Sequence, residues 1–598
     1  MGALFLVDGR NSSFAETALA AGADQLRLQG LEPAAHDLGG WKLLHAPYIQ
    51  GGPETFLADG DDLVAIAGTL VYDGMMGRPA LQALLATIDL PSPDWSRIGG
   101  HFAALVRKDR RTFLLTDFFA AYQLFHDSEL RLFSTSLLAA AEALPRLSFD
   151  PQGVYEFAFN VLPIGDDTIF HELKTLGPYR VVELTRDGAR LHAVAKPLPE
   201  APAKMPLEER IERHREAMSA IVRPQLEAFG AKVNCPLSGG LDSRLLLALM
   251  RAEGWRPNLF VYGGAETGDV RIARDIAEAL GTEIDWLDKE GWRAVEQFEF
   301  DAQVERNYHA YDGLPNYGEL FENGANAFAL ARRHAGGALS ASGSAGEIMR
   351  NFFFLPDRPT PALTVARSFY ARYAPGDATA LFDERAFLRR LEDKILEGLG
   401  LPGERGPLPR GLIEQVYPRV RARAVFGREI SLETRHGAYL TPFMDHRVVA
   451  EAMTLPLGLK NAGRFEAALL DSIDPELARM PSVYGYDFAG PPGLRQRLAE
   501  WSTRARPIWL RQRSYALRRR LGPLADEHGG LLTPEYMGRV VDLEFPAMRR
   551  FFRTDRIADS GMMRRIANLE YLADRLGTRL ADPAQAEPLT HEALRRAA

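Results

Sequence analysis

The stretch Pro236-Leu237-Ser238-Gly239-Gly240-Leu241-Asp242-Ser243 decides how the second half of this sequence folds. It includes the end of a short apolar run, 233–237, and leads into an apolar-periodic stretch, 242–251, so the pattern predicts a strand, a tight turn and a helix. Two glycines let backbone N–H groups approach an anion where the helix begins, and the serine hydroxyls add donors. The stretch therefore indicates a loop that binds phosphate.

Asp242 is the unusual residue of this loop, because a carboxylate repels an anion unless a cation lies between them. A hard cation such as Mg²⁺ is commonly shared in this way between a carboxylate and phosphates. The pattern is not that of the Walker loop, since no Gly-Lys-Ser or Gly-Lys-Thr follows at the required spacing. An ordinary glycine turn that caps a helix is the alternative, and the order of strand, loop and helix favours the phosphate site.

The residues around this loop continue the alternation of strand and helix. The periodicity predicts helices over 207–229 and 270–280, and strands over 259–262 and 284–287. Strands that alternate with helices in this way are typical of a parallel sheet with crossover helices. Beyond residue 360 the pattern is mostly helical.

The first half of the chain has a different pattern, with short apolar runs separated by turn residues, which is typical of strands. Four prolines between 195 and 206 predict a stiff linker, so we expect one domain over 1–195 and another over 206–598. The runs that predict strands are 63–66, 102–106, 112–116, 130–133 and 179–184, and helical stretches are 80–88 and 136–143.

Composition excludes several classes of protein. Of 598 residues, 46% are apolar and 25% charged, which is ordinary for a globular chain, and a net charge of −8 argues against a general nucleic-acid coat. The single cysteine, Cys235, excludes a disulfide framework and a cysteine-rich zinc site, and it suits a reducing cytoplasm. Because there is neither a signal-peptide pattern nor an apolar run of membrane-spanning length, we expect a soluble cytoplasmic protein.

The motif SGGLDS resembles the pyrophosphate loop of ATP pyrophosphatases of the asparagine synthetase type. Enzymes of this family cleave ATP to AMP and pyrophosphate while they activate a carboxylate. Four further stretches resemble the family's segments: 261–264 the second strand, 342–347 its SGDGADE segment, and 431–435 with 442–445 its S-x-E-x-R and PFLD stretches.

The resemblance implies ATP and Mg²⁺ as cofactors, with Asp242 and Glu347 as metal ligands; Glu347 replaces the family's usual aspartate. Either Lys460 or Arg464 would stabilise the transition state, because the family's second lysine is missing here. A surface carboxylate for Glu347 and a solvated side chain for Lys460 are the alternatives. Carried over residue by residue, the nucleotide-binding set is Leu237, Ser238, Gly239, Gly240, Asp242, Ser243, Val261, Tyr262, Ser342 and Gly343.

Residues 1–195 resemble the family's glutaminase domain, on the stretches 68–73, 100–104 and 168–170. That domain uses a cysteine directly after the initiator methionine, and this chain has Gly2 there. Without a thiolate no nucleophile can attack glutamine. The resemblance therefore implies a mixed α/β and α+β fold: an Ntn-hydrolase-like, glutaminase-type sandwich without its nucleophile, followed by a parallel-sheet, adenine nucleotide α-hydrolase-like domain with a helical extension.

Relatives without the cysteine resemble β-lactam or carbapenam synthetases and lasso-peptide cyclases, in which an amine of the same molecule attacks the acyl adenylate. The β-lactam-forming enzymes use a tyrosine–glutamate dyad, and Ser344 stands at the tyrosine's position. The long second half and the aromatic stretch 351–356 favour a peptide substrate, although ordinary core packing also explains that stretch.

We therefore expect a lasso-peptide macrolactam synthetase that acts on a precursor peptide. Its expected partners are a leader-peptide-binding protein and a leader peptidase, with neither nucleic acid nor membrane involved. A divergent ammonia-using asparagine synthetase, a small-molecule β-lactam-type synthetase and a non-catalytic scaffold are the alternatives.

Seven arginines lie between 504 and 520, with Trp501, Trp509 and Tyr515 nearby. This stretch predicts either a helix with a solvated basic face or a docking surface for an acidic peptide or partner.

Overall fold

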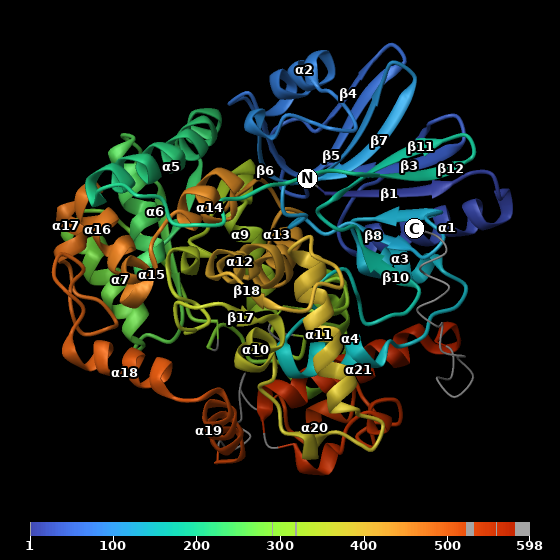
Figure 1. Cartoon of the computed structure of the whole chain (residues 1–598). Helices are drawn as coiled ribbons and strands as arrows, with labels where there is room; N and C mark the ends of the chain where they lie inside the picture. The colour runs from blue at the N-terminus through green and yellow to red at the C-terminus, as the bar shows by residue number, and fades with distance from the viewer. Residues whose placement is uncertain (1, 290, 317–319, 522–530, 558, 581–598) are drawn as a thin grey trace.

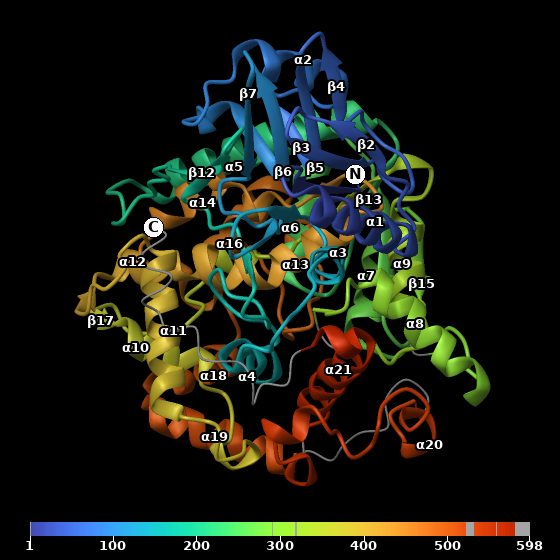
Figure 2. The same ribbon diagram turned by 90° about the vertical axis from the view of Figure 1, so that its right-hand side faces the viewer.

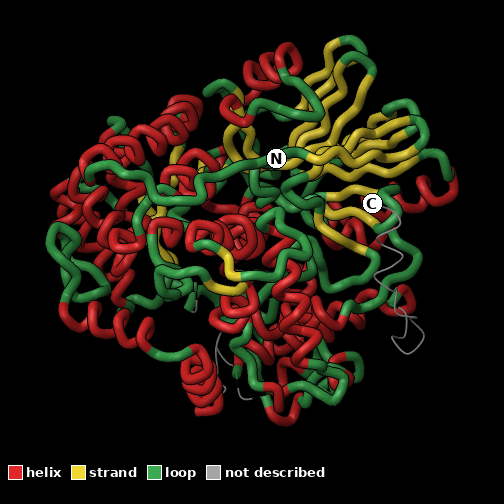
Figure 3. The backbone as a smooth tube through the Cα atoms, viewed as in Figure 1, coloured by secondary structure: helices red, strands yellow, loops and turns green. Residues whose placement is uncertain are grey.

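The computed structural model describes residues 2–289, 291–316, 320–521, 531–557 and 559–580. Two antiparallel sheets lie together at one end of the molecule, and a parallel sheet with its helices occupies the body beside them (Figures 1 and 3). This mixed α/β architecture confirms the fold class expected from the sequence.

The first two sheets have six antiparallel strands each and are built from residues 3–193. The longest strands, β5 (Asp62–Tyr72) and β6 (Ile98–Lys108), pair from Leu63 with Arg107 to Tyr72 with Ile98. One sheet has the order β10-β8-β9-β1-β3-β2 and the other β12-β11-β7-β6-β5-β4. Their remaining strands are β1 Ala3–Asp8, β2 Ala34–Asp37, β3 Trp41–Ala46, β4 Phe56–Asp59, β7 Arg111–Thr116, β8 Phe125–Asp127, β9 Leu132–Ser134, β10 Leu173–Thr175, β11 Arg180–Thr185 and β12 Gly188–Ala193.

The third sheet is parallel and has the order β15-β14-β13-β16-β19. From β13 the chain proceeds outward to β14 and β15, and it later returns to place β16 on the other side of β13. The strand order therefore reverses between β13 and β16, which is where open parallel sheets bind ligands. The strands are β13 Val233–Pro236, β14 Asn258–Tyr262, β15 Ile284–Leu287, β16 Leu339–Ala341 and β19 Tyr439–Leu440; β17 Thr360–Pro361 pairs separately with β18 Pro407–Leu408.

The predicted helices and strands around the phosphate loop are confirmed. The helix predicted over 207–229 is α5 (Leu207–Phe229), and α6 (Leu241–Ala252) begins directly after the two glycines. The other helices are α1 Ser12–Leu28, α2 Gly77–Thr87, α3 Leu137–Ala143, α4 Pro151–Asn160, α7 Gly268–Ala279, α8 Phe300–Ala310, α9 Ala325–Arg333, α10 Ala362–Val365, α11 Glu384–Gly398, α12 Arg410–Val416, α13 Arg423–Glu433, α14 His446–Met453, α15 Leu457–Lys460, α16 Arg464–Ile473, α17 Pro475–Arg479, α18 Leu494–Ala505, α19 Ile508–Leu521, α20 Pro534–Met537 and α21 Ser560–Leu576.

Position 2 has no room for a side chain. A Cβ atom added to Gly2 would lie 2.2 Å from the Ala46 carbonyl oxygen and 2.5 Å from that of Pro47. These carbonyls belong to backbone, so they cannot yield as the end of a flexible side chain could. The first half therefore lacks not only a thiol at this position but also the space for one.

The two halves share one contiguous hydrophobic core. Helix α21, the last α-helix of the described ranges, returns to the first half, where Arg565 donates to the Ala158 carbonyl oxygen at 2.9 Å (Figure 2). The proline-rich segment between the halves is also packed, since Lys196 is buried and its Nζ lies 4.0 Å from the centroid of the Trp95 ring. The boundary at 195–206 stays a prediction.

Asp312 joins the halves electrostatically. Its buried carboxylate forms ion pairs with Arg428 at 3.2 Å and Arg435 at 2.9 Å, and it accepts the N–H of Leu137 at 2.8 Å where α3 begins. Burial by itself would raise the pKa of Asp312, but the guanidinium groups of Arg435 and Arg428 outweigh it and hold the pKa at about 2. The acid is therefore ionised in the folded protein.

We expect Asp312→Asn to lower the free energy of unfolding by about 3–5 kcal/mol near neutral pH, because it leaves two buried guanidiniums without their partner. Because the folded pKa lies below the unfolded value of roughly 3.9, the wild-type advantage is complete above that value and is lost as pH falls toward the folded pKa. Denaturant titrations of both proteins across this pH range measure the difference. Asp24→Asn is the control, since Asp24 forms only an exposed pair with Arg27; equal losses in the two variants would refute the role of Asp312.

No helix in the described ranges combines the length and the apolar character that crossing a membrane requires.

Candidate active site

The serines of the SGGLDS loop hydrogen-bond across it and order its backbone. The N–H of Ser238 donates to Ser243 Oγ at 3.1 Å, the two hydroxyls lie 2.9 Å apart, and the N–H of Gly240 donates to Ser238 Oγ at 3.1 Å. Leu237 is buried, and its N–H donates to the Phe260 carbonyl oxygen at 2.9 Å, which fixes the loop to β14. The loop thus sits at the carboxyl end of β13 with α6 beginning behind it.

The segment after β16 lies against this loop, as the reversal of strand order requires. A Cβ at Gly343 would come within 3.0 Å of the Ser243 nitrogen, and one at Gly346 within 2.1 Å of Asp242 Oδ1. Glycine at 346 is therefore needed for Asp242 to lie where it does. The structure brings together the predicted residues Ser238, Asp242, Ser243, Ser342 and Gly343, together with the backbone next to Glu347.

Asp242 does not lie unpaired in this site. Its Oδ1 accepts a hydrogen bond from Arg350, and the same guanidinium donates to Glu466 Oε2 at 2.8 Å. Burial lowers the pKa of Arg350, but the carboxylates of Asp242 and Glu466 outweigh it and raise that pKa well above its ordinary value. Burial also raises the pKa of Glu466 well above its ordinary value. Arg350 and Glu466 are site residues that the sequence reasoning missed.

Glu347 points toward a different neighbour. Its Oε2 accepts a hydrogen bond from the Tyr417 hydroxyl at 2.7 Å, and the Tyr417 ring lies 4.5 Å from that of Phe352. The predicted aromatic stretch therefore touches the site through Phe352, while Phe353 is buried in the core. Glu347 is half-buried, so its carboxylate is not the simple surface group of the alternative interpretation.

The charged groups around Asp242 and Glu347 indicate whether this part of the site could bind Mg²⁺. Within the described ranges, no three Asp, Glu, His or Cys side chains are grouped closely enough to hold a metal ion by themselves. The charges of Asp242 and Glu347 nevertheless both raise the pKa of Arg350, so both carboxylates lie near one guanidinium already. Mg²⁺ in nucleotide sites commonly takes one or two carboxylates and completes its shell with phosphates and water. The residues present fit such a shared ion but not a protein-only cage.

The two candidate cations differ in exposure. Lys460 is buried, and its Nζ donates to Glu414 Oε2 at 2.6 Å and to the Ile348 carbonyl oxygen at 3.2 Å. The alternative of a solvated Lys460 is therefore wrong, because Glu414 compensates its buried charge. Arg464 is exposed at the first position of α16. Gly463, just before it, lies near Arg350, since a Cβ there would be 3.9 Å from Arg350 Nε.

A second carboxylate cluster lies beside Ser344. Glu429, on α13, accepts hydrogen bonds from the hydroxyls of Tyr439 at 2.6 Å and Ser344 at 3.1 Å. Ser344 is in turn tied to Ser342, whose hydroxyl donates to Ser344 Oγ at 2.8 Å. Burial raises the pKa of Glu429, the Tyr439 hydrogen bond opposes this shift, and the charge of Glu433 adds to it. This pair could not be predicted from the sequence, because Glu429 and Tyr439 belong to no motif.

The proposed nucleoside end is formed by β14. Val261 is buried, whereas Tyr262 is half-buried, with Lys289 4.2 Å above its ring centroid and Arg333 5.5 Å from it. The N–H of Gly263 donates to the Leu287 carbonyl oxygen at 3.2 Å, which ends the strand beside β15.

The segment 480–488 lies over the phosphate loop. The N–H of Val483 donates to the Gly239 carbonyl oxygen at 3.2 Å, while the N–H of Gly239 donates to Asp269 at 2.9 Å. Arg244 anchors this segment from below: its buried guanidinium donates to the carbonyl oxygens of Leu477, Met480 and Pro481. Arg244 is thus a structural anchor for the segment that covers the loop.

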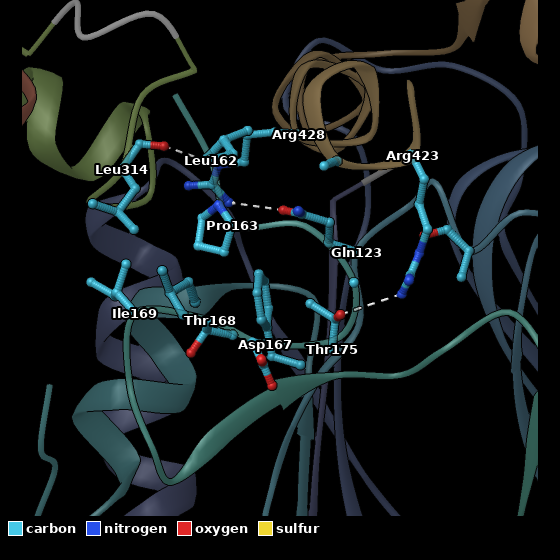
Figure 4. A pocket seen from close by; sticks show the side chains of 15 residues that line it. Gln123, Leu162, Pro163, Asp167, Thr168, Ile169, Thr175, Leu314, Arg423 and Arg428 are labelled. Carbon is cyan, nitrogen blue, oxygen red and sulfur yellow. Dashed lines mark hydrogen bonds between the residues drawn. The ribbon is translucent and has the colours of Figure 1, made fainter. Parts of the chain in front are cut away.

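A cavity of about 50 Å³ at the interface of the halves is lined by Gln123 and Thr175 from the first half and by Leu314, Arg423 and Arg428 from the second (Figure 4). Arg428 donates to Gln123 Oε1 at 3.4 Å and Arg423 to Thr175 Oγ1 at 3.3 Å. One water needs roughly 10–15 Å³ of such space, so this cavity can hold a few waters.

Comparison with known proteins gives a family match and similar solved structures. Residues 213–301 match the family model of asparagine synthase, which covers the phosphate loop, α6, β14, α7 and β15. No curated protein matches the chain.

Among solved structures, glutamine phosphoribosylpyrophosphate amidotransferase from B. subtilis complexed with ADP and GMP is 12% identical, with a TM-score of 0.22, over 48% of this chain and 65% of that one. The allosteric regulatory enzyme of purine biosynthesis is 11% identical, with a TM-score of 0.20, over 48% and 64% of the two chains. The chain thus spans just under two thirds of the length of either structure.

Proposed function

We propose that this protein is an ATP-dependent, AMP-forming carbon–nitrogen ligase that closes a macrolactam in a lasso-type precursor peptide. The observation that carries the proposal is the SGGLDS loop at the point where the strand order of the parallel sheet reverses, within the segment that matches asparagine synthase. In this proposal ATP and Mg²⁺ are the cofactors, and a leader-peptide-binding protein and a leader peptidase prepare the substrate.

The first step activates an Asp or Glu side chain of the peptide. A carboxylate oxygen of the peptide attacks the α-phosphorus of ATP, the bond to the β-phosphate bridge breaks, and pyrophosphate leaves. The backbone N–H groups of 238–240 donate to Ser243 Oγ, Asp269 and Ser238 Oγ in this structure, and they would bind the departing phosphates in place of these acceptors. Asp242 and Glu347 would hold Mg²⁺, which supplies charge compensation for the phosphates when it is bound. Lys460 or Arg464 would add a cation near the same phosphates.

The second step forms the amide. The N-terminal amine of the same peptide attacks the acyl carbon, the acyl–phosphate bond breaks, AMP leaves, and the amine loses its proton. Glu429 is the group that would accept this proton, because it is half-buried, faces Ser344 and has a raised pKa. Holding both ends of one peptide replaces a bimolecular reaction by a positioned one.

The lack of a thiol at position 2 supports a nitrogen nucleophile other than ammonia released from glutamine. Gly2 has no thiol, and the carbonyls of Ala46 and Pro47 fill the space in which a side chain would lie. The nitrogen nucleophile must then come from the acceptor or from free ammonia.

A small-molecule β-lactam-type synthetase is the second candidate, and one observation favours it. Ser344 replaces the tyrosine of the dyad used by such enzymes, but Tyr439 approaches Glu429 from another element at 2.6 Å. A tyrosine–glutamate pair is therefore present although its sequence position differs.

Pyrophosphate release and mass spectrometry of the acceptor test the proposal. The acceptors are a peptide with a free N-terminal amine and one internal Asp or Glu, its N-acetylated form, and aspartate with ammonium. We expect AMP, pyrophosphate and loss of one water with the free peptide; the acetylated peptide should support ATP–pyrophosphate exchange but no ring. Turnover only with aspartate and ammonium would show that the protein is an asparagine synthetase. Turnover only with small amino acids would favour the β-lactam-type synthetase.

A further inference from the structure

Helix α18 presents an apolar stripe to solvent. Leu494, Leu498 and Trp501 follow each other at intervals of four and three residues, so they lie on one face of the helix. Their side chains are 70%, 55% and 61% exposed, respectively. An amphipathic helix normally buries such a stripe against its own protein, and this one is turned outward.

Helix α19 continues the exposed surface. On its inner face Arg511 donates to the Phe353 carbonyl oxygen at 3.3 Å, and Gln512 donates to the Arg367 carbonyl oxygen at 3.2 Å, so this face is fixed to the body of the protein. Trp509 and Leu517 lie on the other side and are 57% and 58% exposed. Both helices lie at the periphery of the molecule, away from the two antiparallel sheets (Figures 1 and 2).

The segment that carries this surface is rich in arginine. Residues 494–521 contain nine arginines and one acidic residue, Glu500, in a chain whose net charge is −8. Glu500 is buried, and its Oε1 lies 3.7 Å from Arg504 Nε, so it offers little negative charge to solvent. The side chains of Arg518, Arg519 and Arg520 are not among those that the structure describes. Those of Arg495, Arg497, Arg504 and Arg513 flank the apolar stripe and are exposed.

Six of the fourteen exposed large hydrophobic side chains in the described ranges fall within residues 494–517. Clustered exposed apolar groups rimmed by charge mark an interaction surface, and tryptophan and arginine are the residues that most often anchor one. The apolar stripe requires apolar groups in the partner, and the arginines require carboxylates between them.

We propose that the outward faces of α18 and α19 form a docking surface for an acidic amphipathic segment of a partner protein. The surface is defined by Leu494, Arg495, Arg497, Leu498, Trp501, Trp509, Arg513 and Leu517. Its apolar groups recur at helical spacing, so a partner helix with leucine or tryptophan on one face and glutamate beside it fits both features. This inference does not depend on the proposed reaction, because none of these residues belongs to the candidate active site.

Binding of a defined probe to the full chain tests the proposal. The probe is a fluorescent synthetic peptide with Leu and Trp on one helical face and Glu at the positions that flank this face, and its binding is followed by anisotropy. We expect saturable binding that weakens as salt rises, since exposed charges are screened. A peptide of the same composition in scrambled order, and one with Lys in place of Glu, should bind at least about tenfold more weakly.

Two variants locate the site. Trp501→Ser and Arg497→Glu should each weaken binding of the probe by at least about tenfold, because the first removes an anchor and the second reverses a flanking charge. Phe298→Ser, at a side chain that is 71% exposed on another surface, and Arg186→Glu, in the turn between β11 and β12, are the matched controls and should bind normally. Thermal unfolding of every variant confirms that it is folded.

Three results would overturn the proposal. The first is equal binding of the probe by wild type, Trp501→Ser and Arg497→Glu. The second is flotation with phosphatidylglycerol vesicles without binding of the peptide, which would make this a membrane surface. The third is a dimer in sedimentation that Trp501→Ser dissociates, which would make a second copy of this chain the occupant.

Discussion

Asp242→Asn is expected to abolish pyrophosphate release while the protein stays folded. Asp242 is the only carboxylate within the phosphate loop itself, and it lies in the first turn of α6 against the Gly346 backbone. Asparagine keeps the shape of the side chain but loses the charge that would hold Mg²⁺ beside the phosphates. We expect the turnover number to fall by about 10³-fold or more, or roughly 4 kcal/mol of transition-state stabilisation.

The control for this variant is Asp275→Asn, on the exposed face of α7. It removes the same charge from the same domain and should leave turnover unchanged. Thermal unfolding separates lost chemistry from lost structure, since Arg350 keeps Glu466 as its partner in Asp242→Asn. Normal pyrophosphate release by a folded Asp242→Asn protein would rule out the assigned role.

The second large effect is expected for Glu429→Gln, and it should fall on amide formation alone. If Glu429 accepts the proton of the attacking amine, its loss slows ring closure by about 10²-fold or more but leaves ATP–pyrophosphate exchange in place. Tyr439→Phe and Ser344→Ala each remove one hydrogen bond to this carboxylate and should have smaller effects. Product mass spectrometry and exchange assays, run side by side, measure the two steps separately.

The pH dependence carries the same prediction. A base must be deprotonated to act, and burial raises the pKa of Glu429 above that of an ordinary glutamate. The rate of ring closure should therefore rise with pH through a value above the usual carboxylate range, and Glu429→Gln should lack this limb. A variant that closes the ring at the wild-type rate, or that loses exchange and closure equally, would contradict the assignment.

Much of the fold was predictable because its signals are local. The glycine pair, the apolar run before it and the periodic stretch after it specify β13, the turn and α6 within a span of twenty residues, 233–252. The strands predicted at 102–106 and 112–116 likewise lie inside β6 and β7. In these segments each residue type agrees with the element that it occupies, so no distant contact is needed to decide the structure.

The partners of the site residues were not predictable in this way. Arg350 reaches Asp242 across 108 residues of sequence, and Glu414 reaches Lys460 across 46. An exposed lysine and a buried, paired lysine can have similar neighbours along the chain. The sequence alone therefore left Lys460 undecided between a solvated group and a cation of the site.

The sequence by itself determined the glycine turn between β13 and α6, the alternation of strand and helix around it, and the absence of a nucleophile at position 2. Only the tertiary structure decided that Arg350 lies between Asp242 and Glu466, that Tyr439 meets Glu429, and that α21 returns to the first half. The physical reason is that periodicity and turn residues act on neighbours along the chain. The pairing of buried charges depends instead on which elements the core brings together.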